Sequence, residues 1–547
     1  SARDHVERLF GKAVAFLEYV RPGFPLAKRM AEKYADGPPK GAVALAMEKH
    51  GLAAWGDTAK QCYENLTSVI EKAAEYVAEQ RKGKQVFGSP ITPALPDDER
   101  STLATAIAPV VRGELARLGW RTVVAFDDSP QTLAHTSGER FAEIASRGVM
   151  TPEHILRAGV RPLVIADTGV GAQRAAPLHS AIGDHVRSAI RHAHVGYVRY
   201  AKDNGQTEPI ADWLKVIAVP GVGTFYAGKD RRNALVAGEC YRATMEAMAG
   251  AEAVERFAFL SDADACEMEY WPLERRKIAE AARKELDGKI ALVIGGASGI
   301  GRATAIRFAH EGAHVAVADL DLDRAEAVAG EINAATPERA LPLAANAADP
   351  AAIEHAVRET VLHFGGLDVL FYSPGVPPEL HSVAEMPDTE VQTQLRVHYE
   401  GGVAATRAVS QVMLAQGVGG RLIYNASKAA FAPGEGAAAY GASKAALVHY
   451  VRNAANELSR RGITANYINA DAIDTPLFRT LVQERASSSG QTEDAVLQRY
   501  ADRSIFRTAS VPPEAVAEAA LWLASDRSAY TSGCVITVGG GSEGMPR

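Results

Sequence analysis

The chain has 547 residues, of which 47% are hydrophobic and 23% are charged. That balance is typical of a folded globular protein, and the length predicts about two to four domains. The formal net charge of -7 gives no general reason to expect nucleic acid or an anionic membrane as a partner. Because no run of about 18 apolar residues occurs, no membrane span is expected either.

The four cysteines are far apart and form no CxxC pair. This usage is typical of a reducing compartment and argues against a disulfide framework or a cysteine-rich zinc site, so we expect a cytoplasmic protein. The first residues, SARDHVERLF, contain neither a signal peptide nor an initiating methionine. We therefore expect that the chain is processed or that a segment precedes it.

Residues 1–95 form the first region of the chain. The stretch AVAFLEYV predicts an extended segment, which RPGF then breaks. The stretch TAKQCYENLTSVIEKAAEYVAEQRKGK has apolar residues at helical spacing and ends in basic residues, as a helix C-terminus does. The repeated breakers of GSPITPALPDD predict a linker, which closes the region near residue 95.

Residues 96–272 form a second region that alternates helical and strand-like segments. Its candidate strands are RTVVAFD, RPLVIAD and LKVIAVPGVGTFYAG. The end of this region echoes the first, because HGLAAWGDTAKQCYEN and PGVGTFYAGKDRRNAL each contain a glycine turn, an aromatic residue, another turn and the start of a long helix. The echo pairs His50 with Pro220 and indicates an internal duplication.

The charged stretch LERRKIAEAARKELDG predicts a linker helix over residues 273–286, and a third region covers residues 287–547. Four short apolar segments of this region, KIALVIGG, HVAVADL, LDVLFYS and GRLIYNAS, are separated by helical patterns. Strands that alternate with helices imply a parallel sheet covered on both faces. The predicted fold class is therefore α/β, with a doubly wound parallel sheet in the third region.

The segment IALVIGGASGIGRATAIRFA runs from a strand through a glycine-rich turn into a helix. Gly295, Gly299 and Gly301 allow a tight turn and the close approach of a pyrophosphate, which the helix N-terminus attracts. The next strand ends at Asp319, 18 residues after Gly301, where a carboxylate can bind a ribose 2′-hydroxyl. The acid at 319, with Ser298 rather than a base in the turn, favours NAD over NADP. The alternative is a structural glycine turn beside a surface aspartate.

Further along, AAAYGASKAALVHY places Tyr440 four residues before Lys444 on a predicted helix, and Ser427 lies 13 residues before Tyr440. Residues four apart share a helix face whatever they do, so the pair alone decides nothing. Together with GGASGIG and the final GCVITVGGG, this ordered set resembles the short-chain dehydrogenase/reductase family over residues 287–547. The resemblance implies a Rossmann domain that transfers a hydride between NAD and a small alcohol or hydroxy-aldehyde.

The same resemblance implies a role for each residue. Tyr440 corresponds to the general acid/base, Ser427 to the serine that orients the substrate oxygen, and Lys444 to the lysine that holds the nicotinamide ribose. Lys444 and the positive nicotinamide ring are both expected to lower the pKa of the phenol, which is about 10 when free. The residues expected at the cofactor are Gly295, Ser298, Gly299, Ile300, Gly301, Asp319, Asn346, Ala347, Gly375, Tyr440, Lys444, Ile473 and Thr475.

Three positions depart from the family pattern. The tripeptide Tyr-Ser-Pro before Gly375 stands where the family has Asn-Asn-Ala, and Ile294 replaces the threonine that opens the glycine motif. His398, in LRVHYEGG, replaces a helix asparagine of the proton relay. Two interpretations of His398 stay open: a proton carrier that joins the catalytic residues, since imidazole titrates near neutrality, or a packed, hydrogen-bonded helix histidine.

The first region carries a second resemblance. MEKHGLAAWGDTAKQCYENLTSVIEKAAEYV is similar to the C-terminal part of the class II aldolase/adducin family, in which zinc acts on a ketose phosphate. His50 corresponds to the third zinc ligand, and the family's other two histidines and its acid/base carboxylate lie further upstream. A catalytic zinc needs three protein ligands, so zinc is expected only in a full-length module. His192 and His194 form a His-x-His, but they do not share a helix face and are interpreted as ordinary histidines.

A partial aldolase, a degenerate aldolase-like α/β module and a dehydrogenase follow one another in the bifunctional rhamnulose-1-phosphate aldolase/short-chain dehydrogenase proteins. This chain resembles them in that order, with VRPGF, CEMEYWPLE, ASKAAFAPG and NADAI at matching places. The resemblance implies that the aldolase half releases lactaldehyde, which the dehydrogenase half oxidises or reduces. Two alternatives stay open: an aldolase-like part that is only an assembly platform, and a dehydrogenase domain that binds NAD without turnover.

Two further expectations concern assembly and the substrate pocket. Related dehydrogenases assemble through two long helices, one of which carries the Tyr/Lys motif, which implies a homodimer or homotetramer. The segment RASSSGQTED, in the stretch that shapes the pocket, is expected to be a mobile lid.

Overall fold

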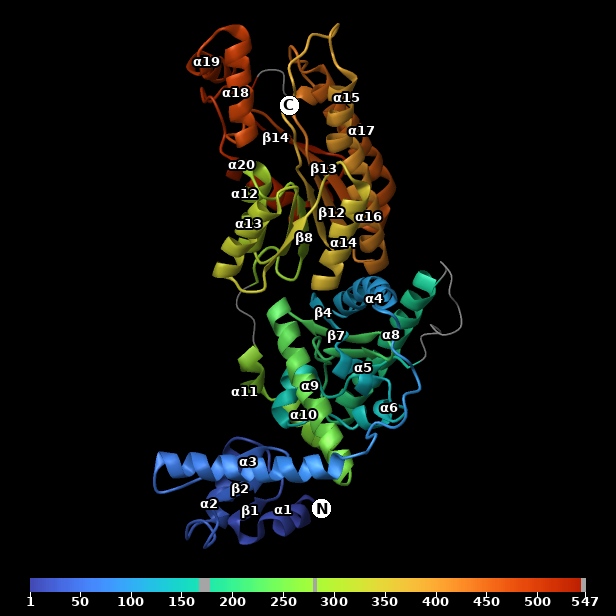
Figure 1. The fold of residues 1–547 in the computed structure, drawn as a ribbon, viewed down its shortest axis with the longest axis vertical. Helices are drawn as coiled ribbons and strands as arrows, with labels where there is room; N and C mark the ends of the chain where they lie inside the picture. Colours follow the sequence, from blue (N-terminus) through green and yellow to red (C-terminus); the bar gives the residue numbers. More distant parts are fainter. Residues whose placement is uncertain (167–177, 279–282, 543–547) are drawn as a thin grey trace.

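The computed structural model describes residues 1–166, 178–278 and 283–542. Within these residues the chain forms three sheets, one after another along the long axis of the molecule (Figure 1). We refer to the N-terminal unit around β1–β3, the middle unit around β4–β7 and the C-terminal unit around β8–β14. The N-terminus lies in the unit at one end and the parallel sheet of the C-terminal unit at the other.

The N-terminal unit is a small three-stranded sheet of order β1-β2-β3, with β1 parallel to β2 and β2 antiparallel to β3. Its elements are α1 (Ala2–Phe10), β1 (Val14–Leu17), α2 (Phe24–Lys33), β2 (Ala44–Met47), β3 (Gly51–Ala54) and α3 (Ala59–Arg81). Thr58 caps α3 by accepting a hydrogen bond from the backbone N–H of Gln61. The buried core between sheet and helices is small and includes Val14, Ala44 and Val69.

The middle unit has a four-stranded sheet of order β4-β7-β6-β5, in which only the β5–β6 pair is parallel. Its strands are β4 (Val123–Asp127), β5 (Leu163–Val164), β6 (Val216–Val219) and β7 (Gly223–Gly228), at the three segments predicted as strands. Its helices are α4 (Asp97–Arg117), α5 (Pro130–Thr136), α6 (Phe141–Ala145), α7 (Pro152–Ala158), α8 (Leu178–Asp203), α9 (Arg231–Val254), α10 (Asp262–Glu269) and α11 (Pro272–Arg275).

The two sequence stretches that echo one another have the same order of elements. The hairpin β2–β3 leads into the long helix α3, and the hairpin β6–β7 leads into the long helix α9. His50 lies in the first hairpin turn and Pro220 in the second. Helices α3 and α9 pack on each other across the two units, with Arg81 paired to Glu246 at 2.7 Å.

The predicted linker helix over residues 273–286 lies partly outside the described residues. Of its described part, α11 ends at Arg275 and a short 3-10 turn follows over Arg276–Ile278. Residues 283–286 contain no helix. The described part of this segment is therefore helical over residues 273–278 and not over residues 283–286.

The C-terminal unit has a seven-stranded, fully parallel sheet of order β10-β9-β8-β11-β12-β13-β14. Its strands are β8 (Ile290–Ile294), β9 (His314–Asp319), β10 (Ala340–Ala344), β11 (Val369–Tyr372), β12 (Gly420–Asn425), β13 (Ile463–Ala470) and β14 (Val535–Val538). The strand order reverses between β8 and β11, and ligands of such sheets bind at this switch point, at the carboxyl ends of the strands.

Helices cover both faces of this sheet, which explains why its central strands are apolar on both sides. One face is covered by α12 (Gly299–His310), α13 (Leu322–Ala335) and α20 (Pro513–Ala524). The other is covered by α14 (Pro350–Phe364), α16 (Gly401–Gln416) and α17 (Ala438–Leu458). A short helix, α15 (Asp388–Gln394), precedes a π-helical turn over Leu395–Glu400 that continues into α16.

The segment RASSSGQTED is not the loop that its composition suggested. It contains the end of α18 (Pro476–Ser489) and the start of α19 (Glu493–Arg503). Gly490 ends α18 in a left-handed conformation with φ 62°, and the Thr492 hydroxyl caps α19 by accepting a hydrogen bond from the N–H of Ala495. Gly and Thr, which read as loop residues, are therefore helix boundaries here.

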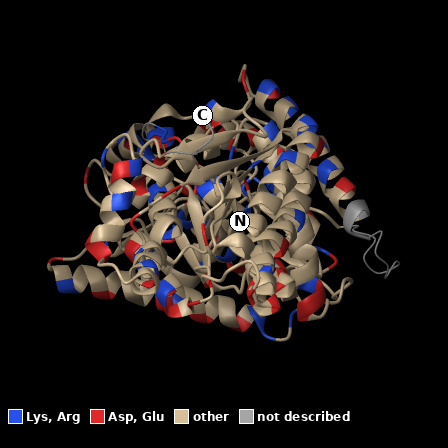
Figure 2. Cartoon of the chain, turned by 90° about the horizontal axis from the view of Figure 1, so that it is seen from above, with Lys and Arg blue, Asp and Glu red and all other residues tan. Residues whose placement is uncertain are grey.

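Charged side chains of both signs are interspersed over the outer helices (Figure 2). In the described part of the chain, no helix combines the length and the apolar character needed to cross a lipid bilayer.

Candidate active site

The glycine-rich turn after β8 is as tight as its sequence predicts. Gly295 and Gly299 have positive φ angles of 77° and 48°. A Cβ on Gly301 would lie 1.8 Å from the carbonyl oxygen of Gly295, so the third glycine allows α12 to pack directly on the turn. Ser298 precedes α12 without capping it through its side chain. The first N–H groups of α12 therefore remain available to a phosphate.

Asp319 ends β9 beside this turn. One of its carboxylate oxygens accepts a hydrogen bond from the N–H of Ala297 at 2.9 Å, and the other accepts one from Asp321 at 3.2 Å. These bonds hold the carboxylate at the carboxyl edge of the sheet, where a ribose hydroxyl of a dinucleotide would lie.

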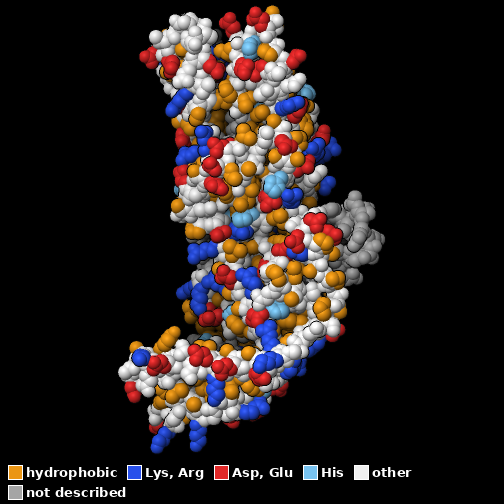
Figure 3. Space-filling model, in the orientation of Figure 1, with side chains coloured by type: hydrophobic (Ala, Val, Ile, Leu, Met, Phe, Trp, Pro, Cys, Tyr) orange, Lys and Arg blue, Asp and Glu red, His pale blue; other side chains and the backbone are white. Residues whose placement is uncertain are grey.

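A cavity of about 450 Å³ lies between the glycine-rich turn, the carboxyl ends of the strands and α17. The space-filling view shows this side of the molecule hollowed between the α18–α19 pair and the region of α15 (Figure 3). The structure brings every residue that the sequence predicts at the cofactor to this one cavity. They are Gly295, Ser298, Gly299, Ile300, Gly301, Asp319, Asn346, Ala347, Gly375, Tyr440, Lys444, Ile473 and Thr475.

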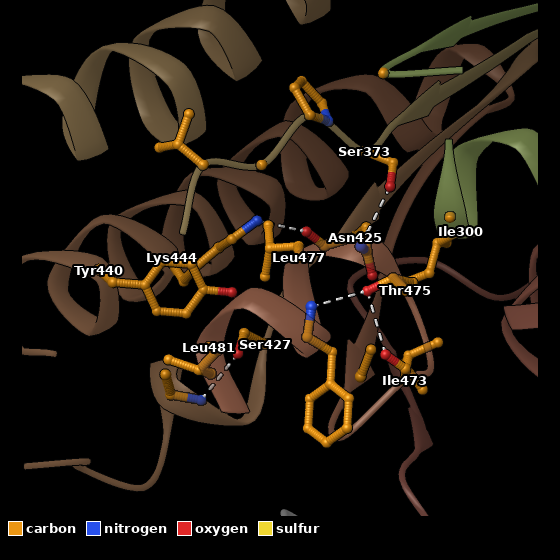
Figure 4. A pocket seen from close by; sticks show the side chains of 18 of the residues that line it. Ile300, Ser373, Asn425, Ser427, Tyr440, Lys444, Ile473, Thr475, Leu477 and Leu481 are labelled. Atoms are coloured by element: carbon orange, nitrogen blue, oxygen red, sulfur yellow. Dashed lines mark hydrogen bonds between the residues drawn. The ribbon is translucent and has the colours of Figure 1, made fainter. Parts of the chain in front are cut away.

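Ser427, Tyr440 and Lys444 point into the same cavity (Figure 4). Tyr440 and Lys444 lie one turn apart on α17, and the Lys444 Nζ is 5.9 Å from the centre of the Tyr440 ring. The Lys444 amine donates a hydrogen bond to the carbonyl oxygen of Asn425 at 3.0 Å. Ser427 follows β12, and its hydroxyl accepts a hydrogen bond from the N–H of Ala429 at 3.2 Å.

Burial controls the protonation of this trio. It lowers the pKa of the Lys444 amine to about 7. It also raises the pKa of the Tyr440 phenol, and a hydrogen bond with Ser427 only partly opposes this shift. The residues of the chain alone therefore do not lower the pKa of Tyr440 as the pairing with Lys444 suggested, because desolvation penalises the charged form of both groups.

His398 lies in the π-helical turn and is fully buried. Its Nδ1 is 3.1 Å from the hydroxyl of Ser443, which itself donates to the carbonyl of Tyr440 at 2.8 Å. Since the Ser443 proton is used in that bond, the network assigns the ring proton to Nδ1 and leaves Nε2 as an acceptor. The ring packs edge-on against Tyr440, with 5.2 Å between centroids.

The His398 ring is held neutral. Its burial and the nearby Lys444 place the pKa of the imidazole well below its usual value. The buried Nε2 has no hydrogen-bond partner within the described residues, and a Cβ on Gly375 would lie 3.9 Å from it. His398 is thus a packed, hydrogen-bonded residue that also offers an unused proton acceptor beside the Gly375 loop.

The tripeptide before Gly375 makes its own bonds in place of those of the usual asparagines. The Tyr372 hydroxyl donates to the carbonyl of Val397 in the π-helical turn at 2.5 Å. The Ser373 hydroxyl accepts a hydrogen bond from the Asn425 amide at 3.2 Å (Figure 4). Sequence reasoning missed Asn425, although it lies two residues before Ser427 at the end of β12, where side chains at the sheet edge face ligands.

The predicted zinc ligand stands apart from this cavity. His50 is half-buried in the β2–β3 turn, and its Nδ1 has no hydrogen-bond partner in residues 1–166, 178–278 and 283–542. Across the same described ranges, no group of three His, Cys, Asp or Glu side chains is placed to hold a metal ion. The described residues therefore do not assemble a catalytic zinc site around His50.

Models of protein families match three successive segments of the chain. Residues 2–77 match the class II aldolase and adducin N-terminal domain. Residues 102–278 match the second domain of class II aldolases. Residues 295–543 match the model described as enoyl-(acyl carrier protein) reductase. The last segment is a short-chain dehydrogenase/reductase domain and defines the protein as an oxidoreductase enzyme.

Relatives extend this assignment to the whole chain. The uncharacterized oxidoreductase YuxG of Bacillus subtilis (strain 168) is 32% identical over 546 residues, which cover 99% of this chain and 78% of YuxG. The short chain dehydrogenase/reductase astE of Aspergillus oryzae (strain ATCC 42149 / RIB 40) is 32% identical over 47% of this chain and 95% of its own. The crystal structure of sorbitol-6-phosphate 2-dehydrogenase SrlD from Erwinia amylovora is 30% identical over 46% of this chain and 98% of its own, with a TM-score of 0.44.

The chain belongs to the family of oxidoreductases, shared with YuxG, that joins class II aldolase-type domains to a C-terminal short-chain dehydrogenase/reductase domain. This fold implies a nicotinamide cofactor, and the residues fit one. The glycine turn leaves room for a pyrophosphate, Asp319 stands where a ribose would lie, and the buried Asn425 Oδ1 has no partner among the described residues.

Proposed function

We propose that the C-terminal unit catalyses NAD-dependent hydride transfer with a small alcohol or hydroxy-aldehyde. The observation that carries this proposal is the convergence of Ser427, Tyr440 and Lys444 on the cavity that also holds the glycine-rich turn and Asp319. Proximity of an acid/base, an orienting hydroxyl and a dinucleotide site is the arrangement that such a reaction requires.

Each residue of the trio has a distinct task. The nicotinamide ring, when bound, exchanges the hydride with the substrate carbon. Ser427 holds the substrate oxygen, and Tyr440 takes its proton during oxidation or returns one during reduction. Lys444 holds the nicotinamide ribose, and the positive charge of the oxidised ring offsets the burial that raises the pKa of Tyr440. His398 acts as a positioning residue that keeps Tyr440 and the Gly375 loop in place.

Asp319 supports NAD rather than NADP as the cofactor. Its carboxylate lies at the end of β9 beside the glycine-rich turn, where the family pattern expects a ribose and where a 2′-phosphate would meet a like charge. Asn346, Ala347, Ile473 and Thr475 also line the cavity, and the family pattern assigns Asn346 to the adenine and Thr475 to the nicotinamide carboxamide.

We further propose a division into residues 1–95, 96–272 and 287–547, in a cytoplasmic homodimer or homotetramer. A second candidate function concerns the aldolase-type part: cleavage of rhamnulose 1-phosphate, with His50 as one zinc ligand and lactaldehyde as the product passed to the dehydrogenase. The aldolase-family match over residues 2–77 favours it, and an assembly platform is the alternative. A zinc content near one per chain together with ketose-phosphate cleavage supports the lyase. The absence of both zinc and cleavage supports the platform.

The deciding experiment for the dehydrogenase is a screen of alcohols, polyols and hydroxy-aldehydes, lactaldehyde included, with NAD and NADP, followed by nicotinamide absorbance. We expect NAD-linked turnover that falls by about a hundredfold or more in Tyr440→Phe, since a positioned acid/base contributes that much. NADH binding, measured by fluorescence, should survive the substitution. The proposal fails if the protein binds NADH but turns over no substrate, or if Tyr440→Phe changes nothing.

A further inference from the structure

The substrate side of the cavity is lined by one face of α18. Leu477, Leu481 and Arg485 all line the cavity, and their spacing of four residues places them in a row on that face. Leu477 and Leu481 lie beside Ser427 and Tyr440 (Figure 4). Arg485 follows about 6 Å further along the helix axis. Helical side chains lean toward the N-terminus, so Arg485 leans back toward Leu481.

Helix α19 adds a second arginine to this wall. Tyr500 and Arg503 also line the cavity. The Arg485 Nη1 donates to the Tyr500 hydroxyl at 2.7 Å, and the Arg503 guanidinium lies 4.8 Å from the centre of the Tyr500 ring. Because Tyr500 is only 7% exposed, it is a fixed surface against which both guanidinium groups rest.

The charged side chains that line the cavity leave an excess of positive charge beside α18 and α19. They are Asp319, Lys428, Lys444, Asp471, Arg485 and Arg503. Asp319 is hydrogen-bonded to Ala297 at the glycine-rich turn, and Lys428 pairs with Asp471 at 3.4 Å. Lys444 is engaged by Asn425 beneath Tyr440.

That leaves the two arginines. Within residues 1–166, 178–278 and 283–542, neither Arg485 nor Arg503 forms an ion pair with a carboxylate. Two guanidinium groups without a carboxylate partner, next to Leu477 and Leu481, give this side of the cavity a net positive charge that suits an anion.

We infer that the substrate carries an anionic group, a phosphate ester or a carboxylate, at the end remote from the reacting carbon. Arg485 and Arg503 bind this group, and Leu477 and Leu481 cover the carbon chain between it and the catalytic trio. Guanidinium forks bind both kinds of anion through paired hydrogen bonds. The inference rests on the proposed function, since it names the substrate class of that same site, and it adds no chemical step.

The test compares three probes that share one carbon chain: ribitol, ribitol 5-phosphate and ribonate. With NAD and the full chain, we expect kcat/KM for at least one charged probe to exceed that for ribitol by about tenfold or more, because hydrogen bonds to a charged group are worth that factor. The preference should shrink as ionic strength rises. Comparison of the two charged probes distinguishes a phosphate substrate from a carboxylate one.

Variants identify the residues responsible. Arg485→Gln and Arg503→Gln should each raise KM for the charged probe about tenfold and so reduce the ratio of its kcat/KM to that for ribitol, and Arg485→Lys should retain part of the preference because it keeps the charge. Arg499→Gln is the matched control, since Arg499 is an exposed arginine of α19 that does not line the cavity. NADH affinity should be unchanged in all four variants.

The outcomes separate this inference from the proposed function. If neutral substrates are turned over as well as anionic ones or better, in this test or in the wider screen, the inference is wrong and the proposed dehydrogenase function is unaffected. A loss of NADH affinity as large as the rise in KM overturns it too, because the arginines would then hold the cofactor. Failure to turn over any alcohol with NAD or NADP rejects the proposed function and the inference together.

Discussion

Lys444 is a residue whose chemistry depends on its surroundings more than on its type. Its side chain is 3% exposed, it stands beneath the Tyr440 ring, and its described hydrogen bond is to a neutral carbonyl rather than to a carboxylate. Burial without a counter-charge explains why the pKa of the amine falls to about 7. In the free protein the charged form of Lys444 is therefore destabilised, and perturbed pKa values of this kind are common at functional sites.

This destabilisation predicts a pH-dependent stability. Lys444 titrates at about 7 in the folded protein and near 10.5 when unfolded, so between these values the unfolded state binds more protons and stability rises with pH. Lys444→Met removes this destabilisation. We expect its melting temperature to exceed that of the wild type below pH 7, with a difference that shrinks as the pH rises toward 10. A melting-temperature difference that stays constant over this pH range would contradict the lowered pKa of Lys444.

The proposed preference for NAD over NADP depends on one carboxylate, that of Asp319. Replacing it in Asp319→Ser keeps a hydrogen-bond acceptor for the N–H of Ala297 and removes the like charge that a 2′-phosphate would meet. We expect the ratio of kcat/KM for NADP to that for NAD to rise about tenfold or more. Asp323→Ser, at an exposed acid of α13, should leave the ratio unchanged. An unaltered ratio in Asp319→Ser would place the ribose elsewhere.

Among the elements, the π-helical turn before α16 sets the position of His398. A π turn leaves a backbone carbonyl without its usual α-helical partner, and such carbonyls must bond elsewhere when buried. Here the Val397 carbonyl accepts from Tyr372 at the end of β11. The strand end and the turn are thereby tied together beneath the loop at Gly375. Tyr372, which reads in the sequence as a departure from a motif, is in the fold the partner of this turn.

Tyr372→Phe tests this coupling of strand and turn. The substitution removes the hydrogen bond from the buried hydroxyl to the Val397 carbonyl, so we expect the protein to lose about 1 kcal/mol of stability and kcat to fall as His398 shifts. Tyr424→Phe is the matched control, because Tyr424 is an equally buried tyrosine of β12 that bonds Thr406 of α16 instead. It should cost comparable stability without lowering kcat. Stability is measured by thermal unfolding and kcat by steady-state kinetics. Equal values of kcat in the two variants would argue against the coupling.

At the scale of the whole molecule, α4 joins the middle unit to the C-terminal unit. The helix packs on α14 and α16, and a Cβ on Gly113 would lie 1.9 Å from the carbonyl oxygen of Gln416. Arg112, which is 4% exposed, bonds Gln416, Asp368 and the carbonyl of Gly288 across this contact. A buried ion pair with satisfied hydrogen bonds at a close backbone contact therefore ties the two units together at this junction.

Arg112→Ala should loosen this junction. It leaves the buried Asp368 carboxylate without its cation, so we expect a loss of about 3 to 5 kcal/mol of stability and faster proteolysis between the units. Arg121→Ala removes another ion pair across the same junction, between Arg121 and Asp526. The side chain of Arg121 is 44% exposed and that of Asp526 is 59% exposed. That exposed pair should contribute less than about 1 kcal/mol. Similar melting temperatures for both variants would show that the junction does not depend on Arg112.

Local patterns were enough for several features. Short apolar runs between helical patterns predicted the parallel sheet, and the glycine spacing predicted a turn that only glycine can form, because both depend on neighbours in sequence. The Tyr440–Lys444 pair and Ser427 were predicted from a family resemblance that rests on the order and spacing of the motifs, and all three line the cavity. The helices α18 and α19 were missed, because glycine and threonine, which were read as loop residues, also serve as helix caps.

The sequence by itself determined the order of the units, the α/β class and the candidate catalytic and cofactor residues that meet at the cavity, but not Asn425 or the arginines of α18 and α19. Only the tertiary structure decided how those residues behave. Desolvation gave Lys444 a pKa of about 7 and kept His398 neutral, and packing against Tyr500 turned two surface-type arginines into one wall of the pocket. The physical reason is that burial and charge pairing depend on groups far apart in the chain, which spacing along the sequence does not encode.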